Sequence, residues 1–151
     1  DIRESILGMR LSSSESGLNN TLEKYLRQFQ ENHHIHAELL IPEIYSEMRL
    51  DAMVELQLLR ILQEALTNIS KHAQAESVKI KFDFINGNFC ITVKDDGLGF
   101  DFMEGLSPLK DHFGLQMMRE RAAAIGGQIK MTSQLGQGTE IRVCVPANME
   151  G

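Results

Sequence analysis

The sequence lacks any apolar run approaching the roughly 20 residues that a membrane-spanning helix needs. It also lacks the pattern of a signal peptide. Hydrophobic residues make up 42% of the chain and charged residues 24%, which is typical of a globular protein. Its 151 residues suffice for one domain with a hydrophobic core, but not for two of ordinary size. We therefore expect one compact, soluble domain without an internal repeat.

An excess of basic residues is missing too. The chain has 15 Lys and Arg against 21 Asp and Glu, a net charge of -6, and the basic residues are scattered singly. Because proteins that bind duplex nucleic acid carry a basic patch, direct nucleic-acid binding is not expected. A bound polyanion must instead be held locally, by backbone N–H groups, a few Lys or Arg side chains, or a metal ion.

Cysteine is scarce. Cys90 and Cys144 lie far apart in the sequence and have no C-x-x-C or His-rich surroundings. This spacing argues against a zinc site and against a disulfide scaffold. We predict a reduced, cytosolic protein.

The periodicity of apolar residues predicts the elements of the fold. Helical spacing predicts helices over residues 1–10, 18–29, 52–73 and 115–125. A short strand is expected at 37–41, alternating strands at 78–84 and 89–94, and two more after Gly126-Gly127. Asn86-Gly87 predicts a tight hairpin turn between the first two alternating strands.

Each of the later strands has one apolar and one polar face, so helices should cover a single side of the sheet. Strands adjacent in sequence form hairpins, which excludes a doubly wound parallel sheet. The predicted fold class is therefore a two-layer α/β sandwich.

Three polar residues form a line on the long helix. Glu64, Asn68 and Lys71 follow one another at i, i+4 and i+7, along the edge of the apolar stripe. The commoner interpretation of such a line is the solvated edge of an amphipathic helix. An Asn in mid-helix is mildly unfavourable, however, and a carboxylate, an amide oxygen and an ammonium together suit Mg²⁺ and phosphate.

Asp95 favours the functional interpretation. Strand parity directs it toward the helices, where a carboxylate is costly without a donor. Turn chemistry alone could account for Asp95-Asp96-Gly97. Gly97 and Gly99 after it would also let a ligand approach the backbone. The amino group of a purine is a natural donor to this acid.

Two further glycine sites follow. Gly114 opens the helix that begins near Leu115, and a helix N-terminus offers free N–H groups to an anion. Gly136-Gln137-Gly138-Thr139 lies between the last two strands, where a hairpin loop is the simplest interpretation. The G-x-x-x-x-G-K-[ST] motif and the G-x-G-x-x-G fingerprint are both absent, which excludes P-loop and Rossmann sites.

In order, these segments resemble the N, G1, G2 and G3 boxes of the GHKL ATP-binding superfamily. The four matching strings are E-A-L-T-N-I-S-K-H-A from Glu64, D-D-G-L-G-F from Asp95, G-L-Q-M-M-R-E-R from Gly114, and G-Q-G-T from Gly136. The variant resembles sensor histidine kinases of the nitrate/nitrite type, which pair with LuxR-type response regulators. The resemblance covers nearly the whole chain from Gly17 on, and Asp1-Ile2-Arg3-Glu4 resembles the end of the second dimerisation helix of that subfamily.

The resemblance implies a Bergerat fold, a mixed and mainly antiparallel sheet with helices on one face, that binds ATP and Mg²⁺. Asn68 would bind the metal, Lys71 would contact phosphate, and Asp95 would accept from the adenine amino group. Gly97 and Gly99 would let the nucleotide close in, Gly114 and Leu115 would offer N–H groups to phosphate, and Thr139 would complete the adenine site. Gly138 would also belong to the nucleotide-binding residues. Two roles stay open. Glu64 would either orient water, as in ATPases, or polarise the attacking imidazole, and His72 is either a ligand or a packed structural residue.

The resemblance further implies that residues 100–113 form an ATP lid, with Phe113 in place of a commoner glycine. Residues 1–16 would be the end of a dimerisation helix and a linker, and residues 17–151 the catalytic, ATP-binding domain. None of His33, His34, His36, His72 and His112 stands in a phosphoacceptor context, so the γ-phosphoryl group would go to a histidine on dimerisation helices absent from this chain.

The expected protein is a cytoplasmic domain of a bacterial sensor kinase, anchored in the inner or plasma membrane and homodimeric at full length, with this chain monomeric. The alternatives are a stand-alone GHKL ATPase or anti-sigma serine kinase, and a non-catalytic nucleotide-binding module.

Overall fold

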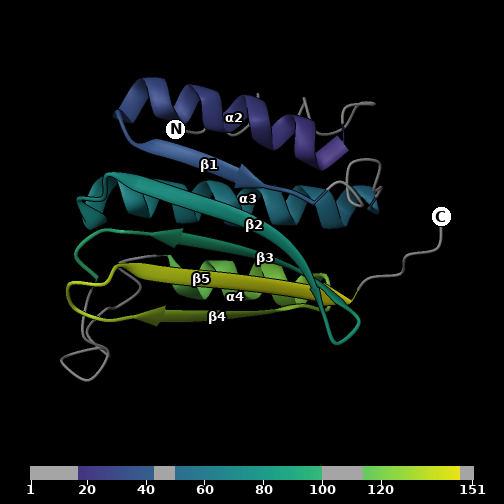
Figure 1. Ribbon diagram of the computed structural model, residues 1–151. Helices are drawn as coiled ribbons and strands as arrows, with labels where there is room; N and C mark the ends of the chain where they lie inside the picture. Colours follow the sequence, from purple (N-terminus) through teal and green to yellow (C-terminus); the bar gives the residue numbers. More distant parts are fainter. Residues whose placement is uncertain (1–16, 43–49, 100–113, 147–151) are drawn as a thin grey trace.

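The computed structural model describes residues 17–42, 50–99 and 114–146 (Figure 1). Along the chain, helices are followed by single strands or by pairs of strands that form hairpins. They are, in order, α2 (Gly17–His33), β1 (His36–Leu40), α3 (Ala52–Asn68), a π-helical segment (Ile69–Ala73), β2 (Ser77–Ile85), β3 (Asn88–Asp95), α4 (Leu115–Ala124), β4 (Gln128–Ser133) and β5 (Thr139–Pro146). The predicted helix over residues 1–10 and the predicted lid over residues 100–113 lie outside the described residues. None of the described helices is long and apolar enough to cross a membrane.

The strands form one five-stranded sheet in the order β1-β2-β3-β5-β4. β1 pairs with β2 in parallel, and the other neighbours are antiparallel. The hairpin between β2 and β3 turns at Asn86 and Gly87, which both have positive φ (52° and 82°) as the sequence predicts. The predicted mixed, mainly antiparallel sheet is confirmed.

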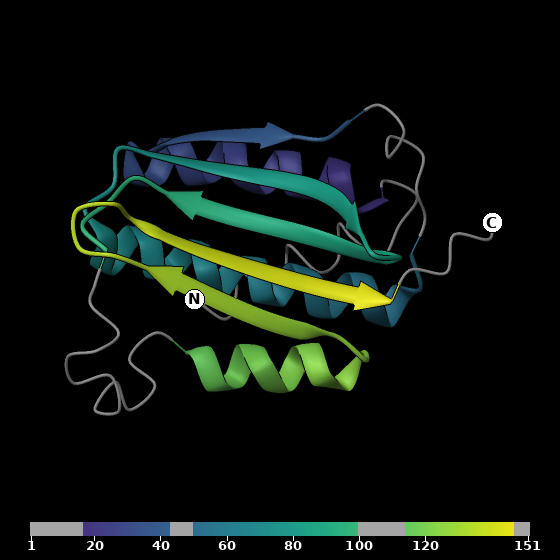
Figure 2. The ribbon, with the colours of Figure 1, turned by 60° about the horizontal axis from the view of Figure 1, so that its bottom comes forward.

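Helices cover one face of this sheet. Figure 1 shows α3 and α4 behind the strands, and the turned view of Figure 2 shows α2 behind β1 and β2 and α4 beside the edge strand β4. The inner face is apolar, with Phe82 of β2 and Phe89 of β3 in edge-to-face contact at 5.2 Å. The helices add Leu22, Leu58 and Met118, each fully buried. The outer face carries polar side chains, so the one-sided layering follows from the alternation of the strands.

The long helix differs from the predicted one in its last turn. Asp51 caps α3 by accepting a hydrogen bond from the N–H of Met53 (3.1 Å). The α-helix ends at Asn68, and residues Ile69–Ala73 continue as a π-helix up to Gln74, whose φ of 52° ends it. A π-helical turn is wider than an α-helical one, so the i+7 spacing from Glu64 to Lys71 does not place them in one straight line.

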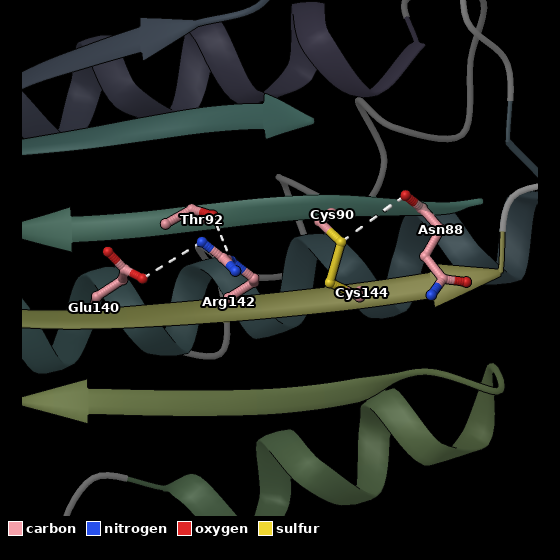
Figure 3. Close-up of a disulfide and its surroundings, with 6 residues drawn as sticks. All are labelled: Asn88, Cys90, Thr92, Glu140, Arg142 and Cys144. Carbon is pink, nitrogen blue, oxygen red and sulfur yellow. Dashed lines mark hydrogen bonds and ion pairs between the residues drawn. A yellow bond between two sulfur atoms is a disulfide. The ribbon is translucent and has the colours of Figure 1, made fainter. Parts of the chain in front are cut away.

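The prediction of two reduced cysteines is wrong. Cys90 of β3 and Cys144 of β5 form a disulfide, with Cα atoms 4.1 Å apart (Figure 3). They are direct partners in the register of the two strands, on the face away from the helices. Sequence separation, here 54 residues, does not reveal such a pair, because strand register brings the two positions together. Figure 3 also shows Arg142 of β5 beside the disulfide, bonded to Thr92 (3.3 Å).

Candidate functional site

Asp95 is a buried carboxylate at the end of β3. It is 3% exposed and lies on the inner face, as strand parity predicts. The N–H of Gly97 donates to its Oδ1 at 2.8 Å, and the N–H of Thr139 donates to the same carboxylate. Burial raises the pKa of the Asp95 carboxyl above its ordinary value, while these two hydrogen bonds oppose the shift. A carboxylate has about four acceptor sites, so Asp95 can still accept from a ligand.

The neighbouring Asp96 has a structural task that the sequence reasoning missed. Its carboxylate accepts from the N–H of Glu76 (2.9 Å), the N–H of Ser77 (3.0 Å) and the hydroxyl of Ser77 (2.9 Å). The bonds from Ser77 lead the causes that lower the pKa of Asp96. Asp96 thereby ties the beginning of β2 to the end of β3 and fixes where Asp95 leaves its strand. The only signal was the Asp-Asp-Gly string, which is equally typical of an ordinary turn.

Two loops meet beside Asp95, backbone against backbone. The N–H of Gly136 donates to the carbonyl of Leu98 at 2.6 Å. A Cβ atom at Gly99 would clash with the carbonyl of Gln134, and one at Gly138 would clash with the backbone carbonyl of Asp95. Both glycines have positive φ, 67° and 80°. Glycine is therefore required at these positions for loop packing, before any ligand is considered.

Glu64 lies against the N-terminal end of α4. A Cβ atom at Gly114, the residue before α4, would lie 2.6 Å from Oε2 of Glu64. The half-buried Leu115 then begins the helix. The structure thus brings a carboxylate from α3 to a helix end whose first N–H groups have no partner within the helix. A helix N-terminus of this kind favours anions.

Asn68 and Lys71 are placed differently from each other. Asn68 is 9% exposed and stands one helical turn after Glu64. Lys71 is exposed, in the π-helical segment. The side chain of His72 lies outside the described residues, so its predicted role stays a prediction.

Arg121 links α4 to α3, the helix that carries Glu64. Its guanidinium donates to Oε1 of Gln57 on α3 at 3.2 Å. Burial and the charge of Arg60 lower the pKa of Arg121, and the charge of Glu64 acts in the opposite direction. Arg121 therefore lies close enough to Glu64 for the two charges to interact.

The predicted site residues fall into two groups. Asp95, Gly97, Gly99, Gly138 and Thr139 meet at one end of β3 and β5. Glu64 and Gly114 meet where α3 faces α4. Oxygen ligands suit Mg²⁺, and a nucleotide-bound Mg²⁺ needs only one or two of them from the protein. Glu64 and Asn68 offer a carboxylate and an amide oxygen one turn apart, so the residues present fit this ion. The described residues contain no group of three or more His, Cys, Asp and Glu that could hold a metal without the phosphates.

Ser133 was also missed. It is the last residue of β4, 8% exposed, and its hydroxyl contacts both the carbonyl of Gly138 (3.1 Å) and the hydroxyl of Thr139 (2.8 Å). A signal did exist, because Ser133 continues the inward series Ile129 and Met131 as a polar residue at an apolar position.

Fold and site together define a two-layer α/β sandwich, with a buried acidic residue and close-packed glycine loops at one end of the sheet. The family model described as "Histidine kinase-, DNA gyrase B-, and HSP90-like ATPase" matches residues 53–149. The chain therefore belongs to this ATPase family, as the sequence predicts, and membership implies ATP binding.

Similar curated proteins are sensor histidine kinases. The chain is 34% identical over 141 residues to the signal transduction histidine-protein kinase/phosphatase DegS of Brevibacillus brevis, covering 93% of this chain and 35% of DegS. It is 33% identical over 147 residues to the oxygen sensor histidine kinase NreB of Staphylococcus carnosus, covering 97% of this chain and 41% of NreB. The chain thus spans less than half the length of these relatives.

Solved structures support the fold. The histidine kinase domain of the blue-light activated kinase EL346 of Erythrobacter litoralis superposes with a TM-score of 0.76 at 17% identity, covering 95% of this chain and 71% of that one. Full-length ShkA in complex with AMPPNP superposes with a TM-score of 0.70 at 19% identity, covering 97% of this chain and 35% of ShkA.

Proposed function

We propose that the chain is the catalytic domain of a sensor histidine kinase, which binds Mg-ATP and donates its γ-phosphoryl group to a histidine on dimerisation helices of the same protein. The observation that carries this proposal is the buried acceptor Asp95, held by the N–H groups of Gly97 and Thr139 inside a family that binds ATP. The similarity to DegS and NreB favours a kinase over the other branches of the family. The structure of ShkA with AMPPNP supports a nucleotide in this fold.

Each group of residues then has a role. Asp95 accepts from the adenine amino group, with Thr139 beside it, while Gly97, Gly99 and Gly138 keep the backbone open to the nucleotide. Gly114 and Leu115 at the start of α4 offer N–H groups to the phosphates. Lys71 reaches phosphate from the π-helical segment, and the role of His72 stays open between ligand and packing.

Asn68 would hold Mg²⁺ through its amide oxygen. When bound, this ion neutralises charge on the phosphates. In the transfer, a histidine nitrogen attacks the γ-phosphorus, the bond to the β–γ bridging oxygen breaks, and ADP leaves. Glu64, next to the helix end that binds phosphate, accepts a hydrogen bond from the attacking imidazole and orients it.

The remaining assignments concern the whole protein. Residues 1–16 would be the end of a dimerisation helix and a linker, and residues 17–151 the catalytic domain of a homodimer. The phosphoryl group would pass to an aspartate of a LuxR-type response regulator. The domain would work in the cytoplasm, where ATP is made, with the full protein anchored in a bacterial membrane. There the Cys90–Cys144 disulfide would meet reducing thiols.

The decisive experiment joins this chain to its upstream helices and follows label from γ-labelled ATP to histidine and then to a receiver aspartate. We expect transfer by the joined protein, no labelling of the 151-residue chain alone, and loss of transfer in Asp95→Asn. Labelling of the chain alone would contradict the proposal. Steady phosphate release would instead indicate a GHKL ATPase. Undiminished transfer by Glu64→Ala would indicate that Glu64 takes no part in the chemistry.

A further inference from the structure

A hydrogen-bonded network of three polar groups links the last residue of β4 to the first residue of β5. Ser133 and Thr139 are partners in the register of these strands, and both face the helix side of the sheet. The hydroxyl of Ser133 lies 3.1 Å from the carbonyl oxygen of Gly138 and 2.8 Å from the hydroxyl of Thr139. Ser133 is 8% exposed, so little water competes for its hydroxyl.

Counting donors shows which hydrogen atom forms each hydrogen bond of this network. A carbonyl oxygen carries no hydrogen and can only accept, so the bond to Gly138 uses the single hydrogen of the Ser133 hydroxyl. The contact between the two hydroxyls must then use the hydrogen of Thr139, because two oxygen lone pairs facing each other at 2.8 Å would repel. The Thr139 hydroxyl therefore donates its hydrogen to Ser133 and can only accept a hydrogen bond from a ligand.

This assignment bears on the neighbouring acid. Asp95 receives the N–H of Thr139, so the carboxylate and the Thr139 side chain belong to one end of the sheet. With Thr139 fixed as an acceptor, two acceptors meet the edge of a bound base, directly or through water. At position 6, a 6-aminopurine offers a donor to them, whereas a 6-oxopurine presents a third acceptor there and carries its donor on N1 instead.

We propose that Ser133 is a positioning residue for base specificity: it fixes the Thr139 hydroxyl as an acceptor and thereby favours 6-aminopurine over 6-oxopurine nucleotides. This inference rests on the proposed function, because it presumes that Asp95 and Thr139 meet the base. The simpler role for Ser133 is to close the loop over residues 134–138. That role would affect stability and the binding of every nucleotide equally.

The test compares Mg-ATP with Mg-ITP, whose bases differ in the amino or oxo group at position 6 and the accompanying N1 hydrogen. Calorimetric dissociation constants are measured for the full 151-residue chain and for Ser133→Ala. Without Ser133, the Thr139 hydroxyl can rotate and donate to the oxo group. We expect the preference for ATP over ITP to fall by about threefold to tenfold, the worth of one net hydrogen bond.

Further variants separate specificity from folding. Ser133→Thr keeps a hydroxyl and should restore most of the preference. Thr139→Val should lose the preference to a similar extent, and combining it with Ser133→Ala should cause little further loss. Thr132→Ala removes a hydroxyl from the outer face of the same strand and should change neither constant.

Equal weakening of ATP and ITP by Ser133→Ala, or an unchanged preference, would overturn the inference and leave the proposed function intact. If Ser133→Ala does not fold, the Thr139→Val measurement decides, since an unchanged preference there would overturn it too. A wild-type chain that binds neither nucleotide would refute the proposed function, and this inference with it.

Discussion

Replacing Gly138 by alanine tests whether glycine is needed there for space or only for backbone conformation. Gly138 and Gly136 share one loop and the same φ of 80°. A Cβ atom at Gly136 would meet nothing within 4 Å, whereas one at Gly138 would run into the backbone carbonyl of Asp95 and lie 3.2 Å from its Oδ1. Gly136→Ala is therefore a matched control for the conformational term.

The expected magnitudes follow from these surroundings. Placing an alanine in the left-handed region destabilises the folded state by about 1–2 kcal/mol, and this term applies to both variants. Overpacking adds about 1–3 kcal/mol to Gly138→Ala alone. We expect Gly136→Ala to lower the free energy of unfolding by about 1–2 kcal/mol and Gly138→Ala to lower it by about 2–5 kcal/mol.

The two variants should differ more in ATP binding than in stability. Any shift that relieves the clash at Gly138 moves the backbone of Asp95, so ATP affinity should fall at least about tenfold there and stay within about twofold in Gly136→Ala. Chemical denaturation gives the free energies, and calorimetric titration with Mg-ATP gives the affinities. Equal destabilisation by the two variants, or ATP binding retained in Gly138→Ala, would refute the reasoning.

Three further predictions concern Asp95, Asp96 and the disulfide. Asp95→Asn should raise the melting temperature of the nucleotide-free chain at neutral pH while abolishing ATP binding, because the buried charge is costly without its ligand. Because the folded pKa of Asp95 is raised, ionisation of Asp95 destabilises the folded wild type as pH rises from the ordinary value of 3.8 through the folded pKa. The difference in melting temperature between variant and wild type should therefore grow over that pH range. Asp96→Ala should lower the melting temperature at neutral pH, because its folded pKa is lowered; this contribution is present above 3.8 and is lost as pH falls through the folded pKa. Reducing the disulfide opens a loop of 54 residues and raises the entropy of the unfolded chain, which lowers the free energy of unfolding by about 4 kcal/mol. Dithiothreitol should therefore lower the melting temperature by roughly 10 °C or more.

Thermal scans at several pH values, with and without reductant, measure all three effects. Asp83→Asn is the control for the two acids, because the Asp83 side chain is partly exposed and its carboxylate pairs with Lys81 at 3.6 Å. It should change neither the melting temperature nor its pH dependence. The two acids have opposite pKa shifts, so the two variants should differ from wild type in opposite directions as pH rises. If both melting temperatures shifted in the same direction relative to wild type, this assignment would be wrong. A Cys90→Ser/Cys144→Ser double variant should melt below wild type and ignore reductant; no response of the wild type to reductant would contradict the entropic argument.

Much of the fold could be predicted from periodicity alone. Alternation fixes which side of β3 is apolar, so the inward position of Asp95 follows from Phe89, Ile91 and Val93. The Asn86-Gly87 turn follows from the preference of both residues for positive φ. These features depend on a few neighbouring residues, which is the information that a single sequence holds.

Other features depend on how distant segments meet. The Cys90–Cys144 pair requires the register of β3 and β5, to which neither cysteine contributes a local signal. The bonds of Asp96 to Glu76 and Ser77 span about twenty residues. The π-helical turn after Asn68 was missed because its residues have the same apolar spacing as an α-helix.

The position of the base-recognition residues within the sheet affects how the domain fluctuates. Asp95 and Thr139 belong to β3 and β5, and each of these strands has a neighbour on both sides. Fraying begins at outer strands, here β1 and β4, whose amides should exchange with deuterium first. The backbone that carries Asp95 and Thr139 can therefore stay paired through such local opening, whereas the Ser133 hydroxyl, which belongs to β4, would separate from Thr139 whenever that strand opens.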